Sequence, residues 1–268
     1  MTDRIPVVAD LPGYVVAVAG LPHSAERVGR AARAIVVVDG STEWWDAASL
    51  AVDAGAVGVL VAEPRAVPFA SVAVLADRAD ARGVPILVHR GGMRADLVDL
   101  AIAQRAGAAP RVTVAECRAT DDDLPAMVRD AVGWTRALAG VPLVVAAAGG
   151  GRDAATALLR AAGDGRVVGS VLVAVTSPGG AVLRVQALGE ATSELEIDAP
   201  LGRIELATST AEGRLVAPAR LESGERASVR RAVDTVARGV PCLELAELLE
   251  DARAAEVILS ASRHPSGL

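Results

Sequence analysis

The sequence of 268 residues contains no lysine, so all 27 of its basic residues are arginine. An arginine side chain stays protonated at any working pH and does not exchange protons as a lysine with a shifted pKa does. Schiff-base chemistry and lysine general-acid catalysis are therefore excluded. Aromatic residues are also scarce, at 2% of the chain, although 52% of its residues are hydrophobic. The core must therefore be built from Ala, Val, Leu and Ile.

The sequence also shows no recognisable targeting or membrane-spanning segment. No apolar stretch approaches the roughly 20 residues that cross a bilayer, and the opening MTDRIPVVAD has no basic region followed by an apolar run. We therefore expect no secretory signal and no membrane partner. Cys117 and Cys242 are far apart and lack metal-ligand spacing, which is typical of a reduced, cytoplasmic protein.

Charge and histidine content exclude two further classes of site. The net charge is −6, the pI is about 5.2, and no basic stripe is present, so we expect no nucleic-acid partner. The three histidines show no i, i+4 pairing, so we expect no metal site. His89 ends an apolar run, where an acid/base group could lie; a capping or solvated side chain is the more ordinary explanation for it.

The first 110 residues or so alternate two kinds of pattern. Short apolar runs predict strands, and segments with helical spacing of apolar residues predict helices between them. The strands are at 14–20, 34–40, 58–64 and 84–90, and the helices at 24–34, 44–56, 69–83 and 93–108. Because the strands are apolar on both faces, they predict a parallel sheet covered by helices.

From residue 111 the pattern changes. A helix with an acidic start is predicted at 121–140, followed by strands at 167–177, 181–189, 193–199 and 203–209 and by helices at 225–239 and 243–261. The last three strands alternate apolar and polar residues, as half-buried antiparallel strands do. The strand at 167–177 is apolar on both faces, so we expect another surface to cover it.

Together these patterns predict an α/β chain of two domains. Residues 1–110 form a reduced Rossmann-like domain with a parallel sheet. Residues 111–268 form an α+β domain, an open, mainly antiparallel sheet with helices on one face. A homo-oligomer is expected through that second sheet.

Four segments, in order along the chain, resemble the glucose–fructose oxidoreductase/inositol dehydrogenase (Gfo/Idh/MocA) family. The first, AIVVVDGSTEWWDAASLAVDAGAVGVLVAEPRA (34–66), resembles the part that carries the family's E-K-P signature. The others are ADRADARGVPILVHR (76–90), DDDLPAMVRDAVGWTRALAG (121–140) and LEDARAAEVILSASRHP (249–265), which resemble the next helix and strand, the D-x-x-x-H-x-x-D helix and the closing helix. The resemblance implies a Rossmann domain for NAD(P) and an open sheet used for oligomerisation and substrate binding.

The resemblance also implies changed catalytic residues. The family's catalytic lysine falls on Glu63, and the glutamate before it on Ala62. On the later helix the two aspartates match Asp123 and Asp130, whereas the histidine falls on Met127. A carboxylate at the lysine position would repel a developing alkoxide, and a methionine offers neither proton nor charge. The chain is therefore interpreted as a degenerate, N-terminally shortened member of the family, a pseudoenzyme for hydride transfer.

The dinucleotide site implied by the family is also changed. The nearest glycine pattern, GLPHSA at 20–25, has Pro22 in place of the second glycine, which removes a donor and crowds a phosphate. Asp39 lies 19 residues after Gly20, where a ribose-binding acid would lie. Gly20 and Asp39 are therefore weak cofactor candidates. We expect no cofactor, with NAD or NADP as the weaker alternative.

Three other features have an ordinary structural explanation beside a functional one. The glycine pattern at 149–154 is interpreted as a flexible connection. Asp121, Asp122 and Asp123 precede a helix, where carboxylates cap exposed N–H groups. Trp44 and Trp45 occupy adjacent helical positions and cannot both face the core, so one of them is a candidate for a pocket or an interface.

Three functions stay open. The leading hypothesis is a non-redox small-molecule-binding protein or a partner subunit in a hetero-oligomer with an active family member. The second is a cofactor-free lyase, isomerase or hydrolase that uses Glu63 and Asp123 as an acid/base pair. The third is an NAD(P)-dependent oxidoreductase acting on a sugar or polyol-like substrate.

Overall fold

The protein is described by a computed structural model that covers residues 4–151, 153–163, 167–176, 180–219 and 222–263. The chain divides into two compact units, residues 1–91 with 221–249 and residues 92–220 with 250–268. The expected boundary at residue 110 is therefore wrong. Helix α4 (Ala95–Gln104) belongs to the second unit, and the chain returns to the first unit to form α6 (Gly224–Arg238).

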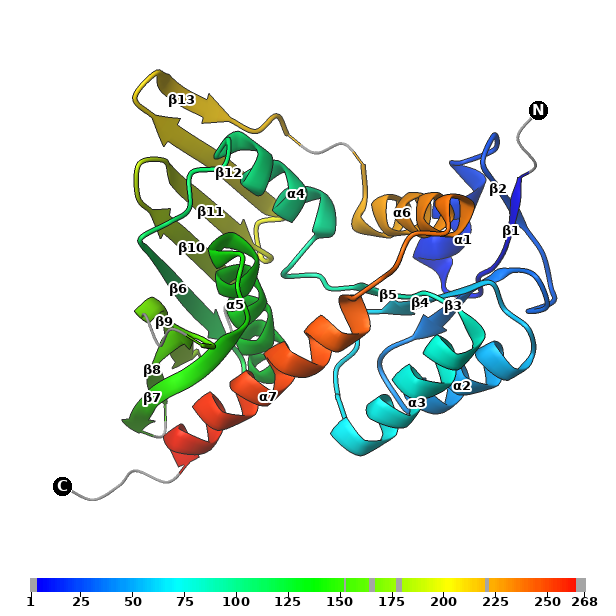
Figure 1. Ribbon diagram of the computed structural model, residues 1–268, viewed down its shortest axis with the longest axis horizontal. Coiled ribbons are helices and arrows are strands. Elements are labelled where there is room, and N and C mark those ends of the chain that lie inside the picture. Colours follow the sequence, from blue (N-terminus) through cyan, green and yellow to red (C-terminus); the bar gives the residue numbers. More distant parts are fainter. Residues whose placement is uncertain (1–3, 152, 164–166, 177–179, 220–221, 264–268) are drawn as a thin grey trace. The chain divides into compact units, whose positions relative to one another are not determined.

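The first unit contains a parallel sheet with the strand order β2-β1-β3-β4-β5 (Figure 1). Its strands are β1 (Ile5–Val8), β2 (Ala25–Arg27), β3 (Ile35–Asp39), β4 (Gly58–Ala62) and β5 (Ile86–His89). Every residue of β4 and β5 is buried. One face packs against α2 (Trp44–Asp53) and α3 (Phe69–Arg82), and the other against α1 (Pro12–Ala19) and α6. The predicted parallel sheet covered by helices is confirmed.

The start of the chain corrects two predicted elements. The apolar run at 14–20 is not a strand but most of α1, because its buried residues Tyr14, Ala17 and Val18 recur at helical spacing after Pro12 at the first helical turn. The segment 24–34 is not a helix; its only strand is β2, which pairs in parallel with β1 through Ile5 and Ala25.

The second unit contains a mixed sheet with the strand order β13-β12-β11-β10-β6-β9-β8-β7. Its strands are β6 (Val112–Ala119), β7 (Leu143–Gly151), β8 (Ala154–Ala161), β9 (Val167–Val175), β10 (Val182–Leu188), β11 (Thr192–Asp198), β12 (Arg203–Thr210) and β13 (Gly213–Val216). Only the β6–β9 pairing is parallel among those described. Helix α4, helix α5 (Leu124–Ala139) and the later turns of α7 (Glu244–Arg263) pack on one face (Figure 1). The predicted open, mainly antiparallel sheet with helices on one face is confirmed.

The glycine pattern at 149–154 lies within a β-hairpin. Gly149, Gly150 and Gly151 belong to β7, and Ala154 begins β8, the antiparallel neighbour. A side chain at Gly150 would place its Cβ 2.3 Å from the carbonyl oxygen of Ala154. The interpretation as a flexible connection is therefore wrong, since the three glycines are part of a strand and Gly150 allows the two strands to approach closely.

No helix in the described part of the chain combines the length and apolar composition that membrane crossing requires.

Gly40, directly after β3, generates the first prediction. Its N–H donates a hydrogen bond of 2.8 Å to the Ala62 carbonyl, and a Cβ here would lie 2.3 Å from that oxygen and 2.6 Å from the Cα of Pro64. Because both obstructing atoms are backbone, we expect Gly40→Ala to lower the free energy of unfolding by about 3 kcal/mol, measured by urea denaturation. The matched control is Gly29→Ala, where a Cβ meets no described atom within 4 Å; a change within about 0.5 kcal/mol is expected there. Equal effects of the two substitutions would contradict the prediction.

Candidate functional site

The carboxyl edge of the parallel sheet collects the polar residues of the first unit. Asp39 ends β3, Glu63 follows β4, and His89 ends β5. The connection after β1 leads to α1, whereas those after β3 and β4 lead to helices on the other face, so the chain changes direction between β1 and β3. In open α/β sheets ligands bind outside the carboxyl ends of the strands at such a point. This edge is therefore the candidate site.

Glu63 has an unusual backbone conformation. Its φ is 49°, in the left-handed region that non-glycine residues seldom occupy. Its N–H donates a hydrogen bond of 2.8 Å to the carbonyl of His89, which fixes the turn after β4 to the end of β5. The side chain is exposed and lies over Gly91, where a Cβ would be 3.2 Å from Oε1. Glu63, which the resemblance matches to the family's lysine, is thus a carboxylate held at the open edge of the sheet.

Tyr14 and His89 form a buried pair at the same edge. The Tyr14 hydroxyl lies 2.5 Å from His89 Nδ1, and the two rings meet edge to face. Burial raises the pKa of Tyr14, and the carboxylates of Glu63 and Glu225 raise it further. The phenol therefore keeps its proton to high pH and is able to donate this hydrogen bond. Tyr14 was missed in the sequence, although it is the only tyrosine in the chain.

The first residue of α6 closes over His89. A Cβ at Gly224 would lie 2.7 Å from His89 Nε2, so only a glycine allows this approach without a shift. Ser223 caps α6 by accepting a hydrogen bond of 3.2 Å from the Arg226 N–H. The His89 ring is thus enclosed by Tyr14 and the start of α6 and is only 6% exposed. A freely solvated strand-end side chain does not describe it.

The two weak cofactor candidates do not form one site. Gly20 ends α1 as its C-cap, far along the helix from the turn that follows β1. Asp39 does end a strand, but its Oδ1 accepts a hydrogen bond of 2.9 Å from the Ser41 N–H. The loop that faces a pyrophosphate in a Rossmann fold is instead the segment from Ala9 to Gly13, between β1 and α1.

This loop does not fit a pyrophosphate with its side chains placed as they are. Leu11 and Pro12 precede Gly13, and no described side chain caps the start of α1. The Glu225 carboxylate lies against Gly13, because a Cβ there would be 3.1 Å from Oε1. A phosphate at this helix start would therefore meet a carboxylate as well as the favourable helix dipole.

The residues matched on α5 lie in the second unit and have structural partners. Asp130 is 3% exposed, accepts a hydrogen bond of 3.0 Å from the Gly92 N–H and forms an ion pair of 3.3 Å with Arg129. Met127 packs against the hydrophobic core of that unit. Asp123 is the N-cap of α5 but has a helical backbone conformation, and its Oδ2 accepts from the Thr120 hydroxyl at 3.1 Å.

One of the two sequence interpretations of these carboxylates changes as a result, and the other stays untested. Asp121 and Asp122 precede the helix in a turn, and among the described residues no side chain caps α5, so the capping explanation for the three aspartates is wrong. Glu63 and Asp123 belong to different units, and their action as an acid/base pair stays a prediction. Within the described ranges, no cluster of three or more His, Cys, Asp or Glu side chains is arranged to hold a metal ion.

The adjacent tryptophans separate into two environments, as their helical positions predict. Trp44 is fully buried and donates a hydrogen bond of 2.8 Å to the Ala66 carbonyl. Trp45 is half-buried and lines a shallow hollow of about 540 Å³ between α2 and α3, together with exposed Leu50 and Val74. Trp45 is therefore the tryptophan placed for a pocket or an interface.

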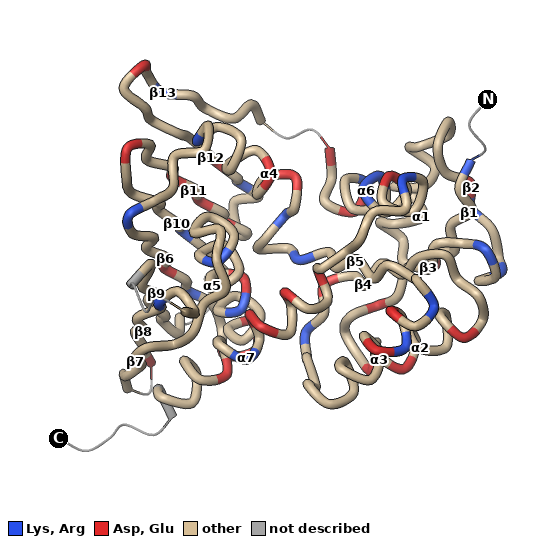
Figure 2. The backbone as a smooth tube through the Cα atoms, in the orientation of Figure 1, with Lys and Arg blue, Asp and Glu red and all other residues tan. Residues whose placement is uncertain are grey.

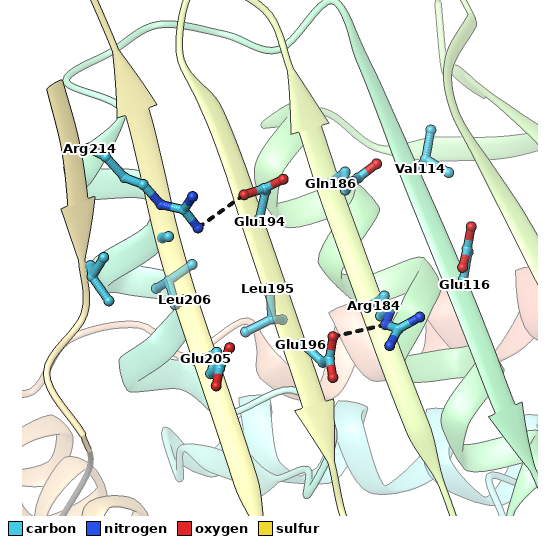
Figure 3. A pocket seen from close by; sticks show the side chains of 12 residues that line it. Val114, Glu116, Arg184, Gln186, Glu194, Leu195, Glu196, Glu205, Leu206 and Arg214 are labelled. Carbon is cyan, nitrogen blue, oxygen red and sulfur yellow. Dashed lines mark hydrogen bonds and ion pairs between the residues drawn. The ribbon is translucent and has the colours of Figure 1, made fainter. Parts of the chain in front are cut away.

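The outer face of the second sheet carries a larger hollow, of about 700 Å³ (Figure 3). Two ion pairs lie on its floor: Arg184 on β10 pairs with Glu196 on the neighbouring β11 at 2.9 Å, and Arg214 on β13 reaches across β12 to Glu194 on β11 at 3.4 Å. The hydrogen bond from Arg184 lowers the pKa of Glu196. Figure 3 shows Gln186 and Glu116 on the same face, so the hollow is polar and carries both signs of charge.

Neither cysteine has surroundings that favour a reactive thiolate. The second prediction follows from this. Burial raises the pKa of Cys242 to about 12, and the Glu244 carboxylate adds to this effect. Burial, assisted by the charge of Asp130, raises the pKa of Cys117 to about 12 as well. Because both pKa values are raised, the thiols stay protonated as the pH rises to 8, and alkylation by iodoacetamide is expected to be roughly a thousandfold slower than for a free thiol. Labelling followed by mass spectrometry should reach both cysteines only in concentrated guanidinium chloride; fast labelling of either in the folded protein would refute this.

Comparisons with known proteins were informative only for structure. Neither a protein-family profile nor a curated protein sequence matches the chain. UDP-N-acetylglucosamine 3-dehydrogenase GnnA from Acidithiobacillus ferrooxidans is 17% identical, with a TM-score of 0.73 over 97% of both chains. KijD10, a 3-ketoreductase from Actinomadura kijaniata in complex with NADP and TDP-benzene, is 13% identical, with a TM-score of 0.67 over 97% of this chain and 98% of its own. GenD2 from gentamicin A biosynthesis, in complex with NAD, is 18% identical, with a TM-score of 0.67 over 98% of this chain and 95% of its own.

These similar structures correct one expectation and confirm another. The expectation of no cofactor is wrong, because the structures that match this chain over nearly their whole length include a dehydrogenase, a 3-ketoreductase in complex with NADP, and GenD2 in complex with NAD. The fold implied by the resemblance is confirmed. The chain has the Rossmann-like fold of the Gfo/Idh/MocA-type oxidoreductases.

Proposed function

We propose that this chain is an oxidoreductase-like protein that binds a nucleotide and a small molecule but does not use lysine-assisted hydride transfer. It acts as a binding protein or as the partner subunit of an active relative. The observation that carries the proposal is the carboxylate of Glu63, held at the edge of the parallel sheet in a chain without lysine. A hydroxyl substrate that loses a hydride must also lose a proton, and a carboxylate there opposes the negative charge that develops on its oxygen.

Two observations support nucleotide binding. The strand order of the first unit changes direction between β1 and β3, which is where such sheets bind nucleotides. Two similar structures, the 3-ketoreductase KijD10 and GenD2, are complexes with NADP and NAD respectively. The β1–α1 loop, however, differs from a glycine-rich phosphate loop, so any nucleotide must be bound by a rebuilt set of contacts.

A second candidate is an NAD(P)-dependent oxidoreductase that has replaced the lysine. The observation in its favour is the Tyr14–His89 hydrogen bond of 2.5 Å at the same sheet edge. A phenol hydrogen-bonded to an imidazole holds one proton at this edge, which is the group that the missing lysine would otherwise supply, but its raised pKa opposes release of that proton and counts against this candidate. In this second candidate Glu63 takes no direct part in the reaction, and its negative charge helps to keep the proton on Tyr14.

The third prediction separates the two candidates. The melting temperature is expected to rise with the concentration of at least one of NADH and NADPH, because a ligand that binds only the folded state stabilises it. No reduction of NAD or NADP is expected with a panel of nucleotide-linked sugars and polyols, followed by absorbance. Glu63→Lys is expected to gain turnover in this assay, whereas the matched control Glu63→Gln, which only removes the charge, is not.

Turnover by the wild type would favour the second candidate. Loss of that turnover in Tyr14→Phe, with an unchanged melting temperature, would then assign the proton transfer to the tyrosine. Absence of any shift with either nucleotide would refute nucleotide binding.

We also propose that the outer face of the second sheet binds a second copy of the chain. By register, Glu116 pairs with Arg184 and Leu172, so one outward row runs across the sheet from charged to apolar residues. Leu172, Leu158 and Val144 are 44%, 46% and 40% exposed on this face. A face with both signs of charge beside an apolar patch can complement itself across a twofold axis.

The fourth prediction tests this surface. Light scattering coupled to size-exclusion chromatography is expected to give a mass well above the 27.2 kDa of one chain. Leu172→Arg is expected to shift the mass toward one chain, because it buries an unpaired charge in the interface. The matched control is Val240→Arg, an apolar residue of the first unit with a similar exposure of 46%, which should leave the mass unchanged. A wild-type mass of one chain would end the proposal.

A further inference from the structure

Helix α6 places two opposite charges at the two ends of α1. Glu225, in the first turn of α6, lies against Gly13 at the start of α1, with Oε1 3.1 Å from a Cβ built there. The next residue, Arg226, lies at the carboxyl end of α1, where its Nε would be 3.5 Å from the Cβ of a side chain placed at Gly20. Figure 2 shows both acidic and basic positions on α6. The two helices pack together within one unit, so this arrangement belongs to the fold of that unit.

These charges match the dipole of α1. The amino end of a helix carries a partial positive charge and the carboxyl end a partial negative one, so a carboxylate at the first and a guanidinium at the second are both favourable. Among the described residues the start of α1 has no side-chain cap of its own, since Leu11 occupies the N-cap position. Glu225 therefore supplies, from another helix, the negative charge that the start of α1 favours.

The same position is where a Rossmann-type fold holds the pyrophosphate of a dinucleotide, at the amino end of the helix that follows the first strand. We infer that the Glu225 carboxylate is an internal anion that takes this place, so that a phosphate-bearing ligand binds only when Glu225 turns away from α1. This inference rests on the proposed function only for the identity of the ligand as a nucleotide. The competition between the Glu225 carboxylate and any phosphate at the start of α1 does not depend on it.

Two negative groups cannot share the start of α1. Glu225 is half-buried, and the other carboxylate that acts on the neighbouring Tyr14 is Glu63. A diphosphate would bring at least two further negative charges next to the Glu225 carboxylate, and displacement of Glu225 removes this repulsion. The side chain leaves α6 near its start, with three rotatable bonds, so it can swing away while the α6 backbone stays in place.

The test measures inorganic pyrophosphate and NADH separately by thermal shift on the full chain. Glu225→Gln keeps the size of the side chain and removes its charge. We expect this variant to bind pyrophosphate about tenfold more tightly than the wild type, because the competing anion is gone. The matched control is Glu222→Gln, which removes a carboxylate three positions earlier that pairs with Arg226 and Arg230 on α6; its pyrophosphate affinity should equal that of the wild type.

The outcomes separate the inference from the proposed function. Tighter pyrophosphate binding by Glu225→Gln with no NADH or NADPH binding by either protein would support the internal anion and refute the nucleotide. Equal pyrophosphate affinity in the wild type and a folded Glu225→Gln would overturn the inference, whatever NADH does. Should Glu225→Gln not fold, Glu225→Asp shortens the side chain and keeps the charge. A pyrophosphate affinity of Glu225→Asp equal to that of the wild type would then overturn the inference, and a higher one would support it.

Discussion

The contact between two loops at the carboxyl edge of the parallel sheet determines the geometry of the candidate site. Gly40 donates to the Ala62 carbonyl, and its own carbonyl accepts from the Arg65 N–H at 3.0 Å, so the turn after β3 holds the turn after β4 from both sides. Between these two bonds Glu63 adopts its left-handed conformation and donates in turn to His89. A strained backbone conformation such as that of Glu63 persists only where the surrounding structure fixes it, and here the ends of β3, β4 and β5 do so.

That fixed edge carries carboxylates together with two arginines, Arg65 in the turn after β4 and Arg90 directly after β5. The exposed carboxylates of Asp39 and Glu63 stand at two strand ends, and Glu225 reaches the start of α1 from a distant part of the sequence. The usual use of such an edge is to bind an anion with backbone N–H groups and a cationic side chain. In this chain Glu63 is a carboxylate at this edge, and Glu225 already lies against the start of α1. The fold of the similar oxidoreductases is thus present with carboxylates at both of these places.

Much of the fold follows from local pattern, and the errors have physical causes. Strands β4 and β5 are apolar on both faces, and α3 is stopped by Gly83 in the left-handed conformation, so both kinds of element are recognisable from the sequence. The run YVVAVAG was misassigned because a short stretch of Val and Ala fits a buried strand or a buried helix equally well. The site depended on contacts that no local pattern contains. Tyr14 meets His89 across 75 residues, and Glu225 meets Gly13 only because α6 returns to the first unit.

Asp130 illustrates why a matched residue does not carry a function by itself. It coincides with the second aspartate of the family's helix, yet its oxygens are engaged by the Gly92 N–H and by Arg129, and a Cβ on Gly92 would lie 2.7 Å from Oδ2. A buried carboxylate with these partners fixes the entry of the chain into the second unit, and removing it would leave a buried Arg129 short of a counter-charge. Its presence is therefore fully explained by packing. The changes at Glu63 and Met127 have no such explanation in the core, since one side chain is exposed and the other fills space that many apolar residues would fill. The positions where this chain departs from the family consequently say more about its chemistry than the positions where it agrees.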